Sequence, residues 1–301
     1  MCVASLKSHL ASLVLQCLDL RCPVFVVLER RAHSTGPLSI TFLGTFRITC
    51  DGPVVTGIES DRGRALLAYL ATESGQAHRR ESLAALLWPN ADKVTASQNI
   101  RRVIYNLRQT LEGEEEGSVL LVTRHDVQFN SAAGHRVDVV VLSNLFEFTT
   151  THPHERVDAC RVCIERLREA VNVYKGEFLA SLSFLDSEPF DAWRRHKQEY
   201  LHARVMEALT HLSAFHKHRQ EYADAIRYLR QQVRLEPWRE EAHYQLMEVL
   251  ALAGQPSAAL LQFETCRHIL ADELGTEPSP ATVALYKRIQ SGGLTARSGR
   301  A

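Results

Sequence analysis

The chain has 301 residues, of which 45% are hydrophobic and 23% are charged, so its composition is that of a globular protein with room for two domains. Its 35 basic and 35 acidic side chains cancel, which excludes binding of a polyanion through bulk charge. Any affinity for nucleic acid has to come from a local basic surface. Seven cysteines without a disulfide framework indicate a reducing, cytoplasmic compartment.

Residues 1–36 differ from the rest of the chain. Their apolar runs, 10–20 and 23–28, are interrupted by charged residues such as Asp19 and Arg21. Neither run approaches the ~20 apolar residues that span a bilayer. The basic start and small-residue cleavage site of a secretory signal are not evident. We interpret this segment as an N-terminal extension without a predicted function, and we expect no association with a membrane.

Residues 38–55 alternate in the way that is typical of strands, as LSITFLGTFRI followed by TCDGPVV. Ile40, Phe42 and Ile48 are β-branched or aromatic, as strands favour. The Asp-Gly pair within 50–53 predicts a turn. We therefore expect a small antiparallel sheet ahead of the first helix.

Two helices are predicted next. The first covers 62–72, RGRALLAYLAT, and Gly75 lies in the segment that ends it. The second covers 80–87, RESLAALL, and it ends before Trp88 and Pro89 because proline cannot continue the hydrogen-bonding pattern of a helix.

A third helix is predicted over 95–111, TASQNIRRVIYNLRQTL, and it contains no acidic residue. Its apolar residues fall within one arc of roughly 100°: Ala96, Ile100, Val103, Ile104, Leu107 and Leu111. The other side is polar: Gln98, Arg102, Tyr105 and Gln109, with Arg101 and Arg108 on the flanks.

The polar side of this third helix favours DNA recognition, because arginine and glutamine can bind base edges in a major groove and phosphate repels acidic side chains. The alternative is an ordinary surface helix that only covers a core. Thr95 followed by Gln98 matches a capping box, with Thr95 as the N-cap. If Gln98 caps its own helix, it is less free to contact a base.

The acidic turn 113–117 is followed by SVLLVTRHDVQFN, which predicts a hairpin with Arg124 and His125 at its tip. A sheet, three helices and a hairpin occur in the order of a winged helix-turn-helix, whose wing would place both side chains on the phosphate backbone. An ordinary surface hairpin is the alternative. Further phosphate contacts could come from four arginines nearby: Arg62, Arg64, Arg79 and Arg80.

From residue 137 onward the pattern is almost wholly helical, and an internal repeat with an interval of 34 residues relates 212 to 246, 225 to 259 and 229 to 263. Gln220 corresponds to Gly254 at the turn between two helices. This is the tetratricopeptide pattern, with atypical helices at both ends. Such an array either offers a concave surface to a protein partner, or packs on the DNA-binding domain or on a second copy, and the pattern leaves both open.

Cys160-x-x-Cys163, preceded by His152 and His154, has the residue types of a zinc site. The two cysteines fall in an apolar-periodic helix and no second C-x-x-C follows, so we favour core cysteines and predict no metal. Neither a G-x-S-x-G elbow nor a glycine-rich nucleotide loop is present. The sequence predicts neither an enzyme nor a cofactor.

The chain from about 38 to 290 resembles the bacterial transcriptional activator domain regulators of the SARP/AfsR-like type. The motifs that carry the resemblance are LLAYLA at 66–71, RRESLAALLWPNAD at 79–92, NIRRVIYNLRQTL at 99–111, YKGEFLASL at 174–182 and the segment 238–289 with its ELG and EPSP elements. The resemblance implies an OmpR-like winged helix-turn-helix followed by a helical activator domain. It also implies side-by-side dimers on direct repeats in promoters, and recruitment of RNA polymerase.

The predicted fold is therefore mainly α, with a winged helix-turn-helix (three helices plus small antiparallel sheets) and an all-α tetratricopeptide-like domain. The predicted boundaries are 37–136 for the DNA-binding domain, 137–290 for the activator domain and 291–301 for a flexible tail. The predicted partners are double-stranded promoter DNA, RNA polymerase and a second copy on DNA.

The predicted DNA-binding residues divide into two sets. In the groove we place Arg101, Arg102 and Tyr105, with Gln98 as a weaker candidate. On phosphates we place Arg108, Arg124, His125, Arg79 and Arg80. The alternative function is a tetratricopeptide adaptor in which a degenerate winged domain serves only for protein contacts.

Overall fold

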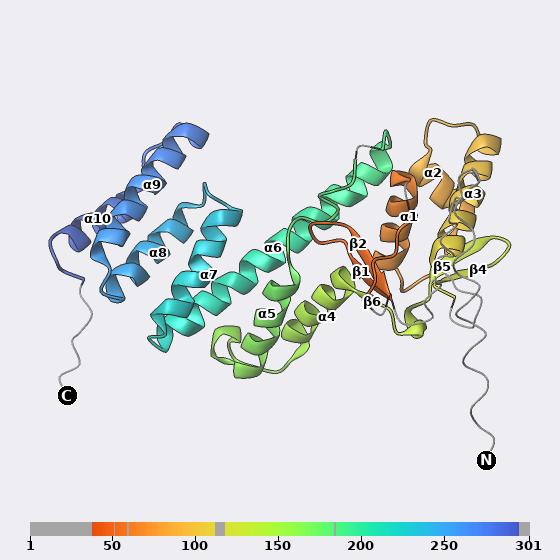
Figure 1. Cartoon of the computed structure of the whole chain (residues 1–301). Coiled ribbons are helices and arrows are strands. Elements are labelled where there is room, and N and C mark those ends of the chain that lie inside the picture. The colour runs from red at the N-terminus through yellow and green to blue at the C-terminus, as the bar shows by residue number, and fades with distance from the viewer. Residues whose placement is uncertain (1–37, 51, 59, 112–117, 184, 295–301) are drawn as a thin grey trace, which may run out of the picture. The chain divides into compact units, whose positions relative to one another are not determined.

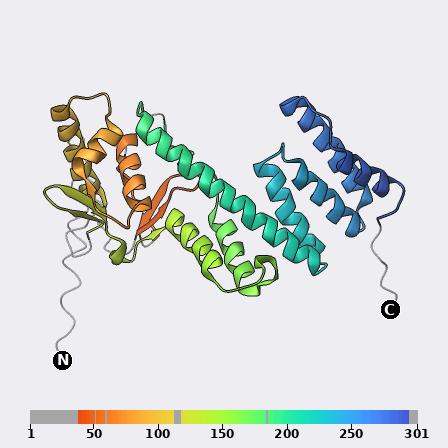
Figure 2. The same ribbon diagram turned by 180° about the vertical axis from the view of Figure 1, so that it is seen from behind.

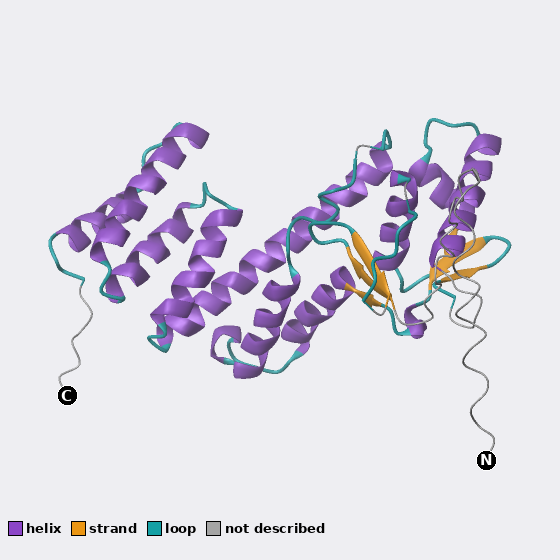
Figure 3. Cartoon of the chain, viewed as in Figure 1, coloured by secondary structure: helices purple, strands orange, loops and turns teal. Residues whose placement is uncertain are grey.

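The computed structural model describes residues 38–50, 52–58, 60–111, 118–183 and 185–294 (Figures 1 and 3). The predicted extension 1–36, the acidic turn 113–117 and the greater part of the predicted tail, 295–301, lie outside the described residues. Among the described helices none has the length and apolar character that crossing a membrane requires.

The winged region, residues 38–137, contains three helices and two small sheets among its described residues (Figure 1). The helices are α1 (Asp61–Thr72), α2 (Arg80–Leu87) and α3 (Lys93–Leu111). The first sheet has the strand order β2 (Arg47–Cys50), β1 (Leu38–Thr41) and β6 (Arg136–Val137). The second has the order β3 (His78–Arg79), β5 (Asp126–Phe129) and β4 (Leu120–Val122). A short 3₁₀ turn, η1 (Ser131–Ala133), leads from the second sheet back to the first.

The first sheet is mixed, whereas we predicted antiparallel pairing only. β1 and β2 pair antiparallel as predicted, with Ile40 opposite Ile48. β6 pairs with β1 in parallel, through Ile40 and Val137. This contact joins residues almost a hundred positions apart, and a two-residue strand has no periodicity from which its partner could be inferred.

The predicted turn at 50–53 is present. The Cys50 amide donates to the Pro53 carbonyl over 3.0 Å, and the Val55 amide donates to the Ile48 carbonyl over 2.8 Å. Gly52 has a φ of +104°, which a residue with a side chain rarely adopts. The Asp-Gly pair therefore marks the turn because its glycine supplies this backbone angle.

The remaining chain is helical (Figures 1 and 2). It consists of α4 (Asp138–Thr151), the 3₁₀ turn η2 (Val157–Ala159), α5 (Arg161–Val173), α6 (Glu188–His218), α7 (Tyr222–Leu235), α8 (Glu240–Leu252), α9 (Pro256–Leu274) and α10 (Pro280–Gln290).

The predicted repeat corresponds to two helical hairpins, α6–α7 and α8–α9. The paired positions 225 and 259 are both fully buried alanines, where small side chains let two helices approach closely. Gln220 and Gly254, the paired turn positions, have φ angles of +59° and +74°. The repeat is thus a repeat of backbone conformation as well as of side chains.

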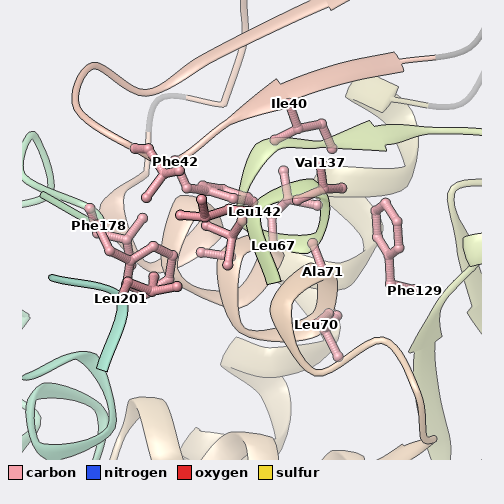
Figure 4. Packing of buried hydrophobic residues seen from close by; sticks show 14 of the residues in the cluster. Ile40, Phe42, Leu67, Leu70, Ala71, Phe129, Val137, Leu142, Phe178 and Leu201 are labelled. Atoms are coloured by element: carbon pink, nitrogen blue, oxygen red, sulfur yellow. The ribbon is translucent and has the colours of Figure 1, made fainter. Parts of the chain in front are cut away.

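The buried hydrophobic residues form two clusters. The predicted domain boundary between residues 136 and 137 does not separate them. One cluster combines the winged region with α4, α5 and most of α6, and Figure 4 shows Phe42, Leu67, Leu142 and Leu201 within it. The other lies within α7 to α10. The first helices of the predicted activator domain therefore share a core with the winged region.

Polar contacts reinforce this shared core. The Asp138 carboxylate, at the start of α4, accepts hydrogen bonds from the amides of Phe42 and Leu43 at 2.8–2.9 Å. Glu73, at the end of α1, accepts one from the Trp193 indole over 2.9 Å and forms an ion pair with Lys197 at 2.8 Å, both on α6. Burial raises the pKa of Glu73, but the hydrogen bonds from Lys197 and Trp193 outweigh it and leave the pKa below its ordinary value.

Candidate nucleic-acid interface

The third helix begins at Lys93, and its cap is Asp92 rather than Thr95. The Asp92 carboxylate accepts hydrogen bonds from the amides of Val94 and Thr95 at 2.9 and 3.0 Å and from the Thr95 hydroxyl at 2.6 Å. These bonds, first of all that from Thr95, lower the pKa of Asp92. The predicted capping box of Thr95 and Gln98 is therefore wrong, because the acceptor that the helix start needs is already supplied three residues earlier.

The two faces of α3 follow the prediction. Ala96, Ile100, Ile104, Leu107 and Leu111 are buried, and Val103 is half-buried. The predicted polar side is exposed, with Tyr105 at 63%. It comprises Gln98, Arg101, Arg102, Tyr105, Arg108 and Gln109. Gln98, which is no cap, lies on this exposed side with the other groove candidates.

The predicted hairpin is present as β4 and β5, with Leu121 opposite Gln128. Its tip is tight, since the Thr123 amide donates to the Asp126 carbonyl over 3.0 Å and the Thr123 hydroxyl accepts from the Asp126 amide over 3.0 Å. Arg124 and His125 are both exposed at this tip. β3 extends the hairpin to a three-stranded sheet through β5, so the wing is joined to the start of α2.

Arg80 connects α2 to the wing. Its amide donates to the His125 carbonyl over 2.9 Å, and its guanidinium donates to the Thr123 carbonyl over 2.6 Å. A guanidinium held in this way orients the wing tip. This geometry gives Arg80 a positioning role beside the phosphate contact that we predicted for it, whereas Arg79 is exposed.

A hollow of about 780 Å³ lies between α2, the first half of α3 and the wing. Its basic lining gathers residues from all three elements: Arg79, Arg80, Lys93, Arg101, Arg124 and His125. Glu81 is the one acidic residue in the lining. The fold thus brings together predicted phosphate ligands that are more than forty residues apart in the sequence. It also adds Lys93, which the sequence analysis missed because the predicted helix began at Thr95.

Arg102 lies on the other flank of α3, where it lines a hollow of about 430 Å³ with Asn99 and Asn106. Arg62 also lines this hollow, but its guanidinium stacks on the Trp88 ring at 5.3 Å and donates to the Leu185 carbonyl over 3.1 Å. Arg64 is similarly engaged, with the Ile58 carbonyl and with Asp61. Arg62 and Arg64 therefore hold the fold together, and we assign neither to phosphate.

Four exposed arginines of this surface have no acidic partner among the described residues. Arg79, Arg101, Arg102 and Arg124 form no ion pair with any other residue that the structure describes. Exposed guanidinium groups without an ion-pair partner on β3, on α3 and at the hairpin tip are available to an anion from solvent. Such a surface can attract the phosphates of a nucleic acid and donate hydrogen bonds to them.

Two known families match the chain and identify the domain to which this surface belongs. Residues 137–290, slightly more than half of the chain, match the family described as "Bacterial transcriptional activator domain". The chain belongs to the bacterial transcriptional activator domain family. A second match, "Transcriptional regulatory protein, C terminal", covers residues 59–127, which contain α1, α2, α3 and the wing of this activator-domain regulator as far as the start of β5.

Individual regulators are similar to the chain over most of its length. The regulator is 25% identical over 270 residues to "Transcriptional regulatory protein MoaR1" of Mycobacterium tuberculosis, covering 85% of this chain and 83% of that protein. It is 26% identical over 271 residues to "Regulatory protein AfsR" of Streptomyces coelicolor, covering 85% of this chain but 24% of that protein.

A solved structure with a similar fold is that of Mycobacterium tuberculosis EmbR in complex with a low-affinity phosphopeptide. The TM-score is 0.59 at 22% sequence identity, over 84% of this chain and 65% of that one. The family, the two matches and the described surface agree. The regulator contains an OmpR-type DNA-binding domain and an activator domain, and the resemblance drawn from its motifs is confirmed. The matched families are regulator domains and not enzymes.

Proposed function

We propose that this regulator activates transcription by binding repeated promoter sequences through α3 and the wing. The observation that supports the proposal is a set of four exposed arginines on and beside α3 that have no acidic partner among the described residues: Arg79, Arg101, Arg102 and Arg124. Because the net charge of the chain is zero, attraction to DNA depends on a local basic surface of this kind. The absence of acidic residues from α3 adds to this, because each would repel the phosphate backbone.

The groove candidates lie on the exposed face of α3. Arg101 and Arg102 can donate to a guanine edge in a bidentate manner, and Gln98 can pair with adenine. Tyr105 adds an exposed aromatic ring to the same face. These side chains would determine which DNA sequence the regulator prefers.

The phosphate candidates surround that face. Arg79, Lys93, Arg124 and His125 line the hollow between α2, α3 and the wing, where they would position the helix without reading sequence. Arg108 lies farther along α3. Arg80 contributes by holding the wing tip in place.

The rest of the proposal follows from the family. Residues 37–136 act as the DNA-binding unit and 137–290 as the activator unit in the cytoplasm. The activator unit contacts RNA polymerase, and two copies lie side by side on adjacent repeats. The resemblance of the chain to SARP/AfsR-like regulators supports these points, and each needs its own measurement.

The first test is the binding of a fluorescent duplex of random sequence at two salt concentrations. Electrostatic binding should weaken steeply as salt rises, with a slope of about −0.9 per phosphate neutralised in a plot of log affinity against log salt. A protein-interaction adaptor with a degenerate winged domain would show no such slope, and that result would refute DNA binding.

The second test is the selection of bound sites from random duplexes, followed by transcription in vitro from a promoter that carries the selected site. We expect two half-sites in direct repeat, occupied by two chains as measured by mass. We also expect more transcript when the regulator is added. A single half-site occupied by one chain would refute the dimer, and an unchanged or reduced transcript level would refute activation.

A further inference from the structure

The connection between α4 and α5 brings together four side chains that can bind metal ions. His152 ends α4 and His154 follows in the loop. Cys160 is the N-cap of α5, and Cys163 lies in the first turn of that helix. Cys163 is fully buried, while Cys160 and the two histidines are half-buried. We predicted core cysteines because both residues were expected inside a helix. Cys160 instead precedes the first residue of α5.

The sulfur and nitrogen atoms converge. The Cys163 Sγ lies 3.6 Å from the Nδ1 of His152 and 3.6 Å from the Nδ1 of His154. The Cys160 Sγ lies 3.8 Å from the same His152 Nδ1. The donor atoms of His152, His154 and Cys163 are all within 4.8 Å of one another.

Hydrogen bonding does not account for this arrangement. An imidazole Nδ1 carries either one proton or one lone pair, yet the Nδ1 of His152 faces the sulfurs of Cys160 and Cys163 at 3.8 and 3.6 Å. A tetrahedral zinc ion with Zn–S near 2.3 Å and Zn–N near 2.05 Å places sulfur and nitrogen roughly 3.5 Å apart. The observed separations of 3.6 to 3.8 Å match three of the six edges of such a tetrahedron, and Cys160 takes part in one of them, with His152.

We propose that His152, His154, Cys160 and Cys163 form a structural zinc site that fastens the end of α4 to the start of α5. Two imidazoles and two thiolates are a common ligand set for structural zinc. Four protein ligands leave no open position, so the proposed role is structural and not catalytic. The site is separate from the DNA-binding surface and does not depend on the proposed function.

A redox-active dithiol is the competing explanation for a C-x-x-C pair at a helix start. It explains Cys160 and Cys163 but assigns no role to two imidazoles directed at the same sulfur. The rings of His152 and His154 stack with their centroids 5.9 Å apart, which presents both Nδ1 atoms to one point. This convergence favours the metal.

The test is a titration of the full chain with Co²⁺ after removal of bound metal by a chelator under reducing conditions. Cobalt replaces zinc in tetrahedral sites, and its bonds to sulfur produce a near-ultraviolet charge-transfer band. We expect that band, with visible bands of tetrahedral Co²⁺, to saturate at one equivalent and to disappear when Zn²⁺ is added. We also expect Zn²⁺ to raise the melting temperature of the metal-free chain.

The variants are chosen in matched pairs. Cys163→Ala should lose the charge-transfer band, whereas Cys266→Ala, also at a fully buried cysteine but in α9, should keep it. His154→Asn should weaken binding, whereas His268→Asn, at an exposed position of α9, should not. If Cys163→Ala fails to fold, the half-buried His154 still provides the test, because its replacement leaves the core intact.

Three results would overturn the proposal. The first is a reduced, folded chain that shows no sulfur-to-cobalt band. The second is a band that persists in both Cys163→Ala and His154→Asn, since the metal would then be bound elsewhere. The third is a Cys160–Cys163 disulfide, found by mass spectrometry in freshly isolated protein, together with failure of the reduced chain to bind either metal.

Discussion

The basic residues of the winged region and those of the helical array α6–α9 have opposite surroundings. In the array most arginines and lysines are paired, either within one helix or between two helices, as in Arg204–Glu207, Lys217–Glu248 and Arg267–Glu264. Around α3 and the wing, Arg79, Arg101, Arg102 and Arg124 have no acidic partner among the described residues. Charges that cancel over the whole chain therefore leave a local positive surface where DNA binding is expected.

The two regions also differ in what holds them together. The array repeats contacts between helices that are adjacent in the sequence. The winged region relies on side chains that bind distant backbone groups, such as Asp138 on Phe42 and Arg80 on Thr123. Removing one such side chain should therefore affect stability more than removing one surface ion pair of the array.

The largest effect is expected from Asp138→Ala. This variant removes the acceptor from two buried amides, those of Phe42 and Leu43. It should lower the free energy of unfolding by about 2–6 kcal/mol, since each of the two unsatisfied amides costs about 1–3 kcal/mol. The control is Asp224→Ala, which breaks a surface pair with Arg227 and should change stability by no more than about 1 kcal/mol. Equal losses in urea unfolding would contradict the comparison.

Arg102→Ala should weaken binding to a selected cognate duplex by about 1–3 kcal/mol and relax preference at one base position, if this side chain reads a base. The control is Arg227→Ala, in the array, whose guanidinium is paired with Asp224. Fluorescence anisotropy on cognate and random duplexes measures both. An unchanged affinity for Arg102→Ala would remove this residue from the groove.

His243, in α8, should make stability depend on pH. Burial lowers its pKa below the ordinary value of 6.5, and its ring nitrogens contact the Pro237 carbonyl and the Gln262 amide at 2.8 and 2.7 Å. A depressed pKa means that the stabilisation is complete above about pH 6.5 and is lost as the pH falls through the folded-state pKa.

This dependence is checked by measuring the free energy of unfolding in urea for the wild type and for His243→Gln, at pH values from about 7.5 down to about 5. The difference in slope should not exceed about 1.4 kcal/mol per pH unit, the limit for one proton. Burial also lowers the pKa of His135 in the winged region, so the wild type alone is no test. If the curves of unfolding free energy against pH are parallel for the wild type and the variant, His243 has the same pKa in the folded and the unfolded state, and the prediction is wrong.

The smallest effect is expected from Arg124→Ala. Loss of one phosphate contact should weaken all duplexes similarly and reduce the salt slope by about 1. The matched control is Arg267→Ala, whose guanidinium binds Glu264 in the array. A loss confined to the cognate duplex would instead assign Arg124 to a base.

Local patterns were sufficient for most elements. Apolar periodicity located α1, α2 and the buried face of α3, and the alternating run with its polar tip located the wing. The repeat located the turns at Gln220 and Gly254, where both residues have positive φ. These features depend on contacts between residues that are close in sequence, which is why their spacing reveals them.

Contacts between distant residues were not predictable in the same way. No spacing indicates that β6 pairs with β1 in parallel, that Arg80 binds the wing or that α4 shares a core with the winged region. The residue types for a zinc site were visible in the sequence, but their convergence on Cys163 depends on how the α4–α5 loop closes. Composition showed which charges and ligands exist, and folding determined which of them meet, because long-range packing alone brings such groups within bonding distance.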